Sequence, residues 1–317
     1  MIDLMNKKNY CFALSILIFI AGIVGLIVNG LQFDIQFQGG TVMQIEMPDG
    51  SFDTERAADI VMETLGKKAS VQKSSTYNAE KGDESINLMV LNIGSEETLN
   101  EEERTKLLGA LREEFNIKEN ANVTVNSVAP FIGDEIKVNA LRAIALSSVM
   151  IILYVWWRFR SMHGLSAGVF AVLALVHDVY AMFAYYVLFK VPINDSFVAA
   201  ALTIIGFSVN DTVVIYDRIR ENTRLMKKAS IHDLVNTSVM ESLTRSINTS
   251  ITTLISILTL YVFAAIYNIQ SIKDFTIPLV VGIISGCYST IFIACPLYMM
   301  WQERRLRNKA ARKPAKA

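Results

Sequence analysis

Six apolar stretches, each about 20 residues long, constrain this chain more than any other feature of its sequence. About 20 apolar residues in a helix cross the hydrocarbon core of a membrane, and helices satisfy their own backbone groups there. The stretches therefore predict six membrane-spanning helices, at residues 10–28, 138–157, 165–189, 197–216, 247–266 and 275–301. With 52% hydrophobic but still 19% charged residues, the chain also has room for one sizeable aqueous domain.

The first apolar stretch follows Lys7 and Lys8, an arrangement that is also typical of a secretory signal peptide. It is longer than a typical signal-peptide core, and no A-x-A-like cleavage site follows it. We therefore interpret residues 1–29 as a short cytoplasmic segment with an uncleaved first span.

The charges are segregated along the chain although the formal net charge is zero. Residues 30–137 contain twenty acidic and ten basic residues, and the remainder has the reverse balance. Basic residues favour the cytoplasmic side of a membrane. We therefore expect both termini in the cytoplasm, residues 30–137 outside, a polar cytoplasmic loop at 217–246 and a basic cytoplasmic tail at 302–317. We expect the part of this tail from residue 304 onward to be disordered and close to anionic lipid.

Residues 30–137 show the patterns of a small α+β domain. Alternating segments at 41–47, 71–77, 85–93 and 122–128 predict strands. Helices are predicted at 54–67, with Asp53 as N-cap, and at 96–115, and a turn at 78–84. The resulting order β-α-β-β-α-β is the ferredoxin-like split arrangement. The sequence thus predicts a six-helix membrane protein with a ferredoxin-like extracytoplasmic domain.

Several residue types indicate binding or mechanical work more than bond chemistry. The three cysteines all lie in apolar stretches, without a CxxC or metal-ligand spacing, and most such cysteines are small core residues. Residues 30–137 contain no histidine and no nucleophile–base pair. We expect no cofactor, no metal and no enzymatic activity.

Polar residues within the predicted spans are the candidate site. A carboxylate in hydrocarbon is costly and usually faces a bundle interior or a water path. The candidates are His177 and Asp178 in span three, Asn210 and Asp211 in span four, and Arg245 and Asn248 at the start of span five. At 1.5 Å per residue, in a core of about 30 Å, Asp178 is expected nearer the outside and Asp211 nearer the cytoplasm. Arg245 would then reach Asp211 or Asp217. This arrangement suits a proton path, because it has proton acceptors at different depths and a cation that can pair with them or release them.

Other interpretations of these residues remain open. Asp211 would also serve as a structural partner of Arg245, and His177 as a structural hydrogen-bonding group. Helix neighbours point about 100° apart, so only one of His177 and Asp178 is expected to face the bundle. The charges from Asp217 to residue 221, including Arg218, are typical of a solvated helix end. The glycine pair at residues 39 and 40 is typical of an ordinary turn or bulge.

Five segments together resemble the SecF family, the accessory subunits of the bacterial Sec protein translocase. They are IIGFSVNDTVVIYDRIREN at 204–222, FDIQFQGG at 33–40, VAPFIGDEI at 128–136, LVHDV at 175–179 and TRSINTSITTL at 244–254. The first is similar to the family's fourth-span signature and is the most specific. The resemblance extends from about residue 7 to residue 301.

The resemblance implies a function that composition and spacing do not give. A member of this family pairs with SecD as a heterodimer, joins the SecYEG channel, with a YajC-type accessory protein as a further possible partner, and uses the proton motive force to promote preprotein translocation across the bacterial cytoplasmic membrane. Asp211 and Arg245 match residues implicated in proton coupling; Asp178, Asn210 and His177 are further candidates. The motif positions that would serve structure or interfaces are Gly39, Gly40, Asp217, Arg218 and Asn248.

Two rival functions have different expectations. A proton-driven small-molecule exporter of the wider resistance-nodulation-division superfamily would usually have larger external domains and two halves in one chain. A purely structural, channel-stabilising subunit would use its buried charges only for assembly. No feature of the sequence indicates a nucleic-acid partner; protons, membrane lipid and preproteins are the expected ligands.

Overall fold

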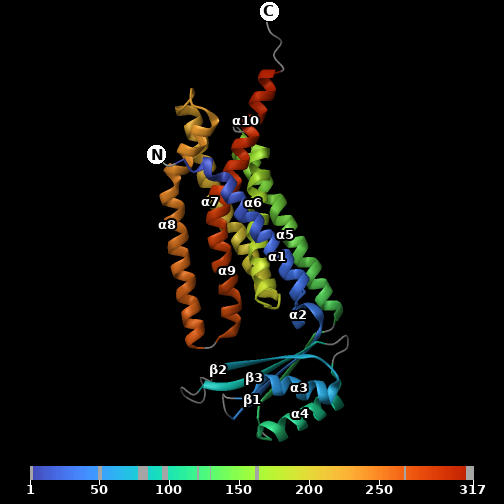
Figure 1. Cartoon of the computed structure of the whole chain (residues 1–317). Helices are drawn as coiled ribbons and strands as arrows, with labels where there is room; N and C mark the ends of the chain where they lie inside the picture. Colours follow the sequence, from blue (N-terminus) through green and yellow to red (C-terminus); the bar gives the residue numbers. More distant parts are fainter. Residues whose placement is uncertain are drawn as a thin grey trace, which may run out of the picture.

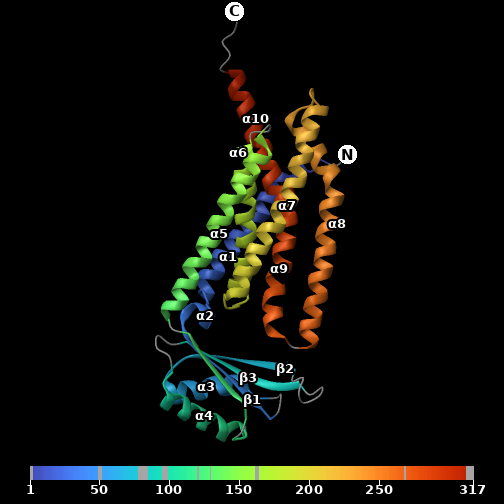
Figure 2. The ribbon, with the colours of Figure 1, turned by 180° about the vertical axis from the view of Figure 1, so that it is seen from behind.

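The computed structural model consists of a long helical bundle above a small sheet domain, and both termini lie at the end of the bundle far from the sheet (Figures 1 and 2). It describes residues 3–48, 52–77, 85–94, 99–119, 121–128, 130–160, 164–267 and 269–311. The predicted turn at 78–84, the first residues of the predicted helix at 96–115 and the end of the basic tail at 312–317 lie outside these ranges.

Six helices of the described chain are long and apolar enough to cross a membrane, which confirms the predicted spans. They are α1 (Lys8–Asn29), α5 (Pro130–Arg158), α6 (Gly164–Leu188), α7 (Asp195–Leu225), α8 (Ile231–Ile266), and α9 (Gln270–Ser289), which continues through a π-helical segment (Thr290–Ala294) into α10 (Cys295–Ala311). A short 3-10 turn (Met5–Lys7) precedes α1, and a single turn, α2 (Ile35–Gln38), follows it.

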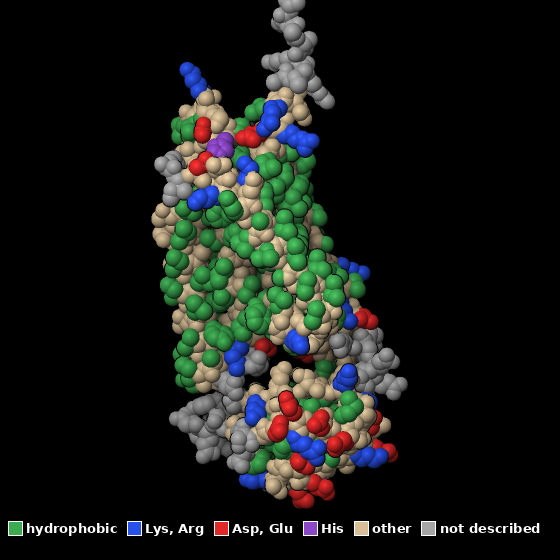
Figure 3. Space-filling model, in the orientation of Figure 1, with side chains coloured by type: hydrophobic (Ala, Val, Ile, Leu, Met, Phe, Trp, Pro, Cys, Tyr) green, Lys and Arg blue, Asp and Glu red, His purple; other side chains and the backbone are tan. Residues whose placement is uncertain are grey.

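The helices differ in how far they are buried. Helices α6, α7 and α9 form the centre of the bundle and pack against one another, whereas α1, α5 and α8 lie at its edge with most of their surface exposed. Apolar side chains cover the outside of the bundle, and charged side chains collect on the sheet domain and at the opposite end (Figure 3). A surface of this kind is stable in hydrocarbon and is not stable in water.

The predicted polar loop at 217–246 is wrong in most of its length. Helix α7 continues to Leu225 and α8 begins at Ile231, so only residues 226–230 connect the two helices. Ser230 caps α8 by accepting a hydrogen bond from the Asp233 N–H. Charges read as loop residues instead pair across the helices, because Glu241 accepts hydrogen bonds from both Arg218 and Asn222.

The basic tail also differs from the prediction of disorder. Helix α10 continues to residue 311, so the first half of the tail is helical. Glu303 and Arg307 lie one turn apart, 3.8 Å between their charged atoms, and the good helix formers of this segment extend a helix that the membrane span has already nucleated.

The sheet domain has the predicted element order. Four strands, β1 (Gly40–Met47), β2 (Ala69–Tyr77), β3 (Ser85–Gly94) and β4 (Val123–Val128), form one antiparallel sheet in the order β2-β3-β1-β4. The helices α3 (Thr54–Leu65) and α4 (Glu101–Phe115) cover one face. Alternate residues of β1, such as Met43 and Ile45, are fully buried beneath them, as a two-residue period requires.

The domain helices begin at residues that satisfy their first N–H groups. Asp53 accepts from the N–H groups of Glu55 and Arg56, which confirms it as the N-cap of α3. Asn100 and Glu103 form a reciprocal capping box at the start of α4. The described part of the predicted helix therefore begins at Glu101, and the predicted start at residue 96 lies outside the described residues.

A backbone contact ties the start of the sheet domain to the bundle. The Asp34 N–H donates to the Ile193 carbonyl, and the Ile193 N–H donates to the Gln32 carbonyl, 2.9 Å in both cases. Ile193 lies in the short connection between α6 and α7, so the segment that enters β1 is hydrogen-bonded to the two central helices. These hydrogen bonds hold the entrance of the domain against the connection between the two helices.

Candidate functional site

The centre of the bundle is held together by a close approach of α9 to α7. A Cβ on Gly282 would lie 2.5 Å from Ile204 Cγ1, and a Cβ on Gly286 would lie 3.2 Å from Ser208 Cβ. Small residues at such positions let two helices in a membrane approach closely. The approach brings the polar groups of α7 and α9 into reach of α6.

Asp178 of α6 lies in this contact and is fully buried. Its carboxylate accepts hydrogen bonds from three hydroxyl groups: Ser208 on α7 at 2.8 Å, and Ser285 and Ser289 on α9 at 2.6 and 2.8 Å. Hydrogen bonds to a charged acceptor are the strong ones. The three hydroxyls satisfy the carboxylate within this chain and connect three helices at one point.

The three serines were missed by sequence reasoning, although a signal for two of them exists. Ser285 and Ser289 are four residues apart on α9 and therefore share one helix face. Two hydroxyls on one face of an otherwise apolar helix indicate a buried polar partner. Nothing in the sequence pairs that face with Asp178 rather than with Asp211.

His177 is also buried, so the expectation that only one of the two neighbours faces the bundle is wrong. The imidazole Nδ1 lies 3.4 Å from Asp178 Oδ1, and the ring packs against Phe19 of α1 and Tyr288 of α9. His177 is buried because helix α1 packs against α6 on the side that does not face α7. The Nε2 of His177 is buried without a hydrogen-bond partner.

Asp211 lies three residues beyond Ser208 on α7, about one helical turn or 4.5 Å further toward the end that carries the termini. Along the bundle, Asp178 is therefore the nearer to the sheet domain and Asp211 the nearer to the opposite end, which is the predicted order, but their separation is small. Asp211 is only 7% exposed, and its Oδ2 is buried without a hydrogen-bond partner. Ser246 of α8 lies beside the carboxyl, yet its buried hydroxyl has no partner of good geometry.

The remaining candidates in the spans are exposed polar side chains of α7 and α8. Arg245 is within electrostatic reach of Asp211, but the two described residues form no ion pair, and the arginine side chain is exposed. Asn210 and Asn248 are exposed as well. The structure thus places the buried Asp211 close to the exposed Arg245.

Asp217 and Arg218 form a separate charged cluster at the end of the bundle. Asp217 pairs with Arg158 of α5 at 3.1 Å and with Arg220 at 2.6 Å. The predicted reach of Arg245 extends to Asp211 and not to Asp217, whose two partners are both arginines of α5 and α7. Arg218 pairs with Glu221 and Glu241, so both candidates fix the contact of α7 with its neighbours.

The backbone conformation at the entrance of the sheet domain explains the glycine pair there. Gly39 and Gly40 have φ angles of +81° and +138°, which side chains rarely adopt. A Cβ on Gly40 would lie 2.3 Å from the Ile93 carbonyl of β3. The pair turns the chain from α2 into β1 and permits the first ladder contact.

Among the described residues, no group of three or more histidine, cysteine or acidic side chains has the geometry of a metal site. The arrangement is instead one of isolated carboxylates in an apolar bundle. Such groups exchange protons or pair with charges from outside the chain.

Residues 110–304 match the family described as "Protein export membrane protein SecD/SecF, C-terminal". The chain is similar to the protein translocase subunit SecF of Anaerolinea thermophila, 32% identical with both chains covered completely, and to that of Thermobaculum terrenum, 35% identical over 96% of this chain and 95% of the relative.

Longer relatives contain the matched region as one part. The protein translocase subunit SecDF of Bacillus subtilis is 32% identical over 98% of this chain and 39% of its own length. A crystal structure of SecDF, a translocon-associated membrane protein from Thermus thermophilus, superimposes with a TM-score of 0.78 at 28% identity, over 96% of this chain and 39% of that one. This chain therefore spans about two-fifths of the SecDF proteins that it matches, and SecF is fused to SecD in some species.

Proposed function

Because this chain belongs to the SecD/SecF family of protein export membrane proteins and is an accessory subunit of the Sec protein translocase, we propose that it couples the proton motive force to preprotein movement. The supporting observation is Asp211: a carboxyl buried in a membrane bundle with one oxygen that has no hydrogen-bond partner among the described residues. The protein is a multi-pass bacterial membrane protein.

The proposed coupling step is protonation of Asp211. As a charged group in hydrocarbon, the carboxylate is unstable by several kcal/mol unless it is paired. A proton arriving from outside neutralises it, and loss of the proton to the cytoplasm restores the charge next to Arg245. Moving one charge through 100 mV yields about 2.3 kcal/mol, so a few protons per cycle suffice to bias a rearrangement of a few kcal/mol.

In this proposal a partner subunit supplies a further charged group for the coupling step. The exposed polar side chains of Asn210, Arg245 and Asn248 fit contact with SecD, which would contribute a further acidic group. SecYEG is the proposed channel, a YajC-type protein a further partner, and preproteins the substrate. We propose no enzymatic activity and no cofactor.

The proposed orientation puts both termini in the cytoplasm and the sheet domain outside. Basic residues at the terminal end of the bundle support it. The β-α-β-β-α-β order and the antiparallel sheet order support a ferredoxin-like extracytoplasmic domain. The hydrogen bonds between Asp34 and Ile193 provide the route by which a shift of α6 against α7 would move that domain.

The experiment is Asp211→Asn in cells depleted of the native protein. We expect recovery of the SecD complex as in wild type, a several-fold slower secretion of a preprotein, and little further slowing when the proton gradient is dissipated. Loss of the complex would make Asp211 a structural group and favour the channel-stabilising role. Unchanged secretion would contradict the proton role of Asp211. Thr203→Ala, at an exposed position of the same helix that the proposal does not use, removes no titratable group and is the control.

A further inference from the structure

A cavity of about 700 Å³ opens between α5, α6 and α10 at the end of the bundle that carries the termini. Its lining includes Trp156 and Arg160 of the α5 end, Leu165 and Ser166 of α6, and Trp301 and Arg305 of α10. It is remote from Asp178 and Asp211, and nothing in the proposed coupling uses it. Its volume falls in the range of small-molecule sites.

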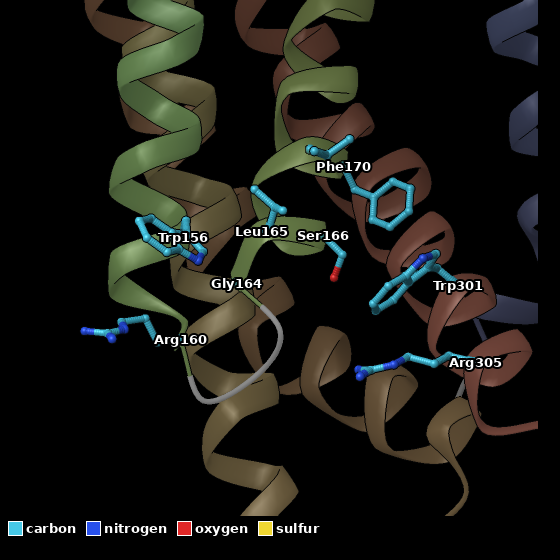
Figure 4. A pocket seen from close by; sticks show the side chains of 9 residues that line it. Trp156, Arg160, Gly164, Leu165, Ser166, Phe170, Trp301 and Arg305 are labelled. Carbon is cyan, nitrogen blue, oxygen red and sulfur yellow. The ribbon is translucent and has the colours of Figure 1, made fainter. Parts of the chain in front are cut away.

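The charge of the cavity is positive. The Arg305 guanidinium lies over the Trp301 ring, 5.4 Å from the ring centroid, and both side chains extend from α10 toward the beginning of α6 (Figure 4). Arg160 stands at the opposite rim with its guanidinium turned outward. Among the described residues neither Arg160 nor Arg305 has an ion-pair partner, unlike Arg158 and Arg307.

The cavity also receives the beginning of a long helix. Helix α6 begins at Gly164 and extends for 25 residues, so its first N–H groups and the positive end of its dipole face this region. The hydroxyl of Ser166 points into the same space (Figure 4). Two tryptophans, Trp156 and Trp301, form walls at the depth where aromatic side chains meet lipid headgroups.

An apolar track leads from the cavity along α6 into the bundle region. Leu165, Val169, Leu173 and Val176 are 59, 42, 47 and 54% exposed. Their spacing of four, four and three residues puts them on one helix face. A ligand with a charged head and a long hydrocarbon chain matches both the cavity and the track, whereas a free anion would use only the cavity.

We propose that this cavity binds the phosphate headgroup of an anionic phospholipid from the leaflet at the terminal end of the bundle. Arg305 pairs with the phosphate, and Arg160 at the rim adds positive charge. One acyl chain lies along the exposed face of α6. Basic pockets between spanning helices hold anionic headgroups in this way.

The test uses the fluorescence of the cavity tryptophans. The chain has three tryptophans; Trp157→Phe removes the one outside the cavity lining. The purified full-length variant is titrated in mixed micelles with brominated-chain phosphatidylglycerol or brominated-chain phosphatidylcholine. We expect half-quenching at a several-fold lower mole fraction of phosphatidylglycerol. Arg305→Gln should raise that mole fraction about five-fold, the equivalent of about 1 kcal/mol per basic residue, and leave phosphatidylcholine unchanged.

Arg307→Gln is the matched control, because it removes the same charge from the same helix outside the cavity. It should leave the preference unchanged. Each variant is normalised to unbrominated lipid and checked for an unchanged melting temperature; Arg160→Gln replaces Arg305→Gln if the latter unfolds. Equal quenching by the two lipids in the parent, or equal losses in Arg305→Gln and Arg307→Gln, would overturn the proposal. Relief of quenching by about 10 mM inorganic phosphate would show a free-anion site instead and overturn it as well.

Discussion

Asp178 and Asp211 are two carboxyl groups about one helical turn apart along the bundle, and they differ in how they are hydrogen-bonded to the neighbouring helices. Asp178 accepts from three hydroxyls in the contact of α6, α7 and α9. Asp211 lies beside α8, most of whose surface is exposed, and its Oδ2 has no hydrogen-bond partner among the described residues. Burial alone therefore does not distinguish the two carboxyls: Asp178 is hydrogen-bonded and holds helices together, and the proposed function assigns the response to a proton or a partner to Asp211.

The largest effect on stability should come from Asp178→Ala. The substitution leaves three buried hydroxyls without their acceptor, at a cost of about 3 kcal/mol, which lowers Tm by roughly 5–10 °C in a chain of this size. The measurement is thermal unfolding of the purified chain in detergent. Asp211→Ala is the comparison and should change Tm by less than about 2 °C or raise it, since it removes an oxygen with no partner. Equal losses would abolish the distinction between the two carboxyls.

Gly282→Leu should have the next largest effect. The new side chain meets Ile204 and Met182 and pushes α9 from α7, which lengthens the Ser285 contact with Asp178. Overpacking of this kind costs roughly 1–3 kcal/mol. Gly206→Leu on α7 is the control, because no atom lies within 4 Å of the Cβ position there. A loss in the control as large as in Gly282→Leu would show that helix propensity or detergent contacts, and not the close approach, set the result.

Removal of single hydroxyl groups tests the difference in hydrogen bonding between Asp178 and Asp211 one hydrogen bond at a time. Ser285→Ala removes one 2.6 Å hydrogen bond to Asp178 and should lower stability by about 1–2 kcal/mol. Ser246→Ala beside Asp211 should have almost no effect, because its hydroxyl makes no hydrogen bond. Thermal unfolding of both variants checks this. A clear loss in Ser246→Ala would mean that Asp211 is satisfied from α8 after all.

The difference between these carboxyls was only partly predictable. Apolar length predicts the six spans, and the cost of charge in hydrocarbon selects Asp178 and Asp211 as candidates. Which of them is satisfied depends on Gly282 and Gly286 bringing the α9 serines within reach, and this is long-range packing that no local pattern encodes. The helical extension of α7 and α8 was missed for a related reason, because Glu241 and Arg218 meet only once both helices exist.

Glu103 in the sheet domain is a carboxylate near the surface, and we expect its hydrogen bonds to contribute less to stability than those of the buried Asp178. Lys67 donates a 2.9 Å hydrogen bond to Glu103, and this, together with the Asn100 N–H, holds the pKa of Glu103 below its ordinary value. The contribution to stability is therefore present above about pH 4.5 and is lost as the pH falls through the lowered pKa. For a pair this exposed it should amount to less than about 1 kcal/mol.

Hydrogen exchange of peptides from residues 99–115 measures this effect in the intact protein. Glu103→Gln should speed exchange up to about five-fold at pH 6, and the difference should shrink at a second, lower pH at which wild type loses its own charge. Glu102→Gln, on the exposed side of the same helix turn, should match wild type at both pH values. If Glu103→Gln also matched wild type at pH 6, the Lys67 contact would contribute nothing, and the contrast with Asp178 would show that burial between three helices is what makes a hydrogen-bonded carboxylate stabilising here.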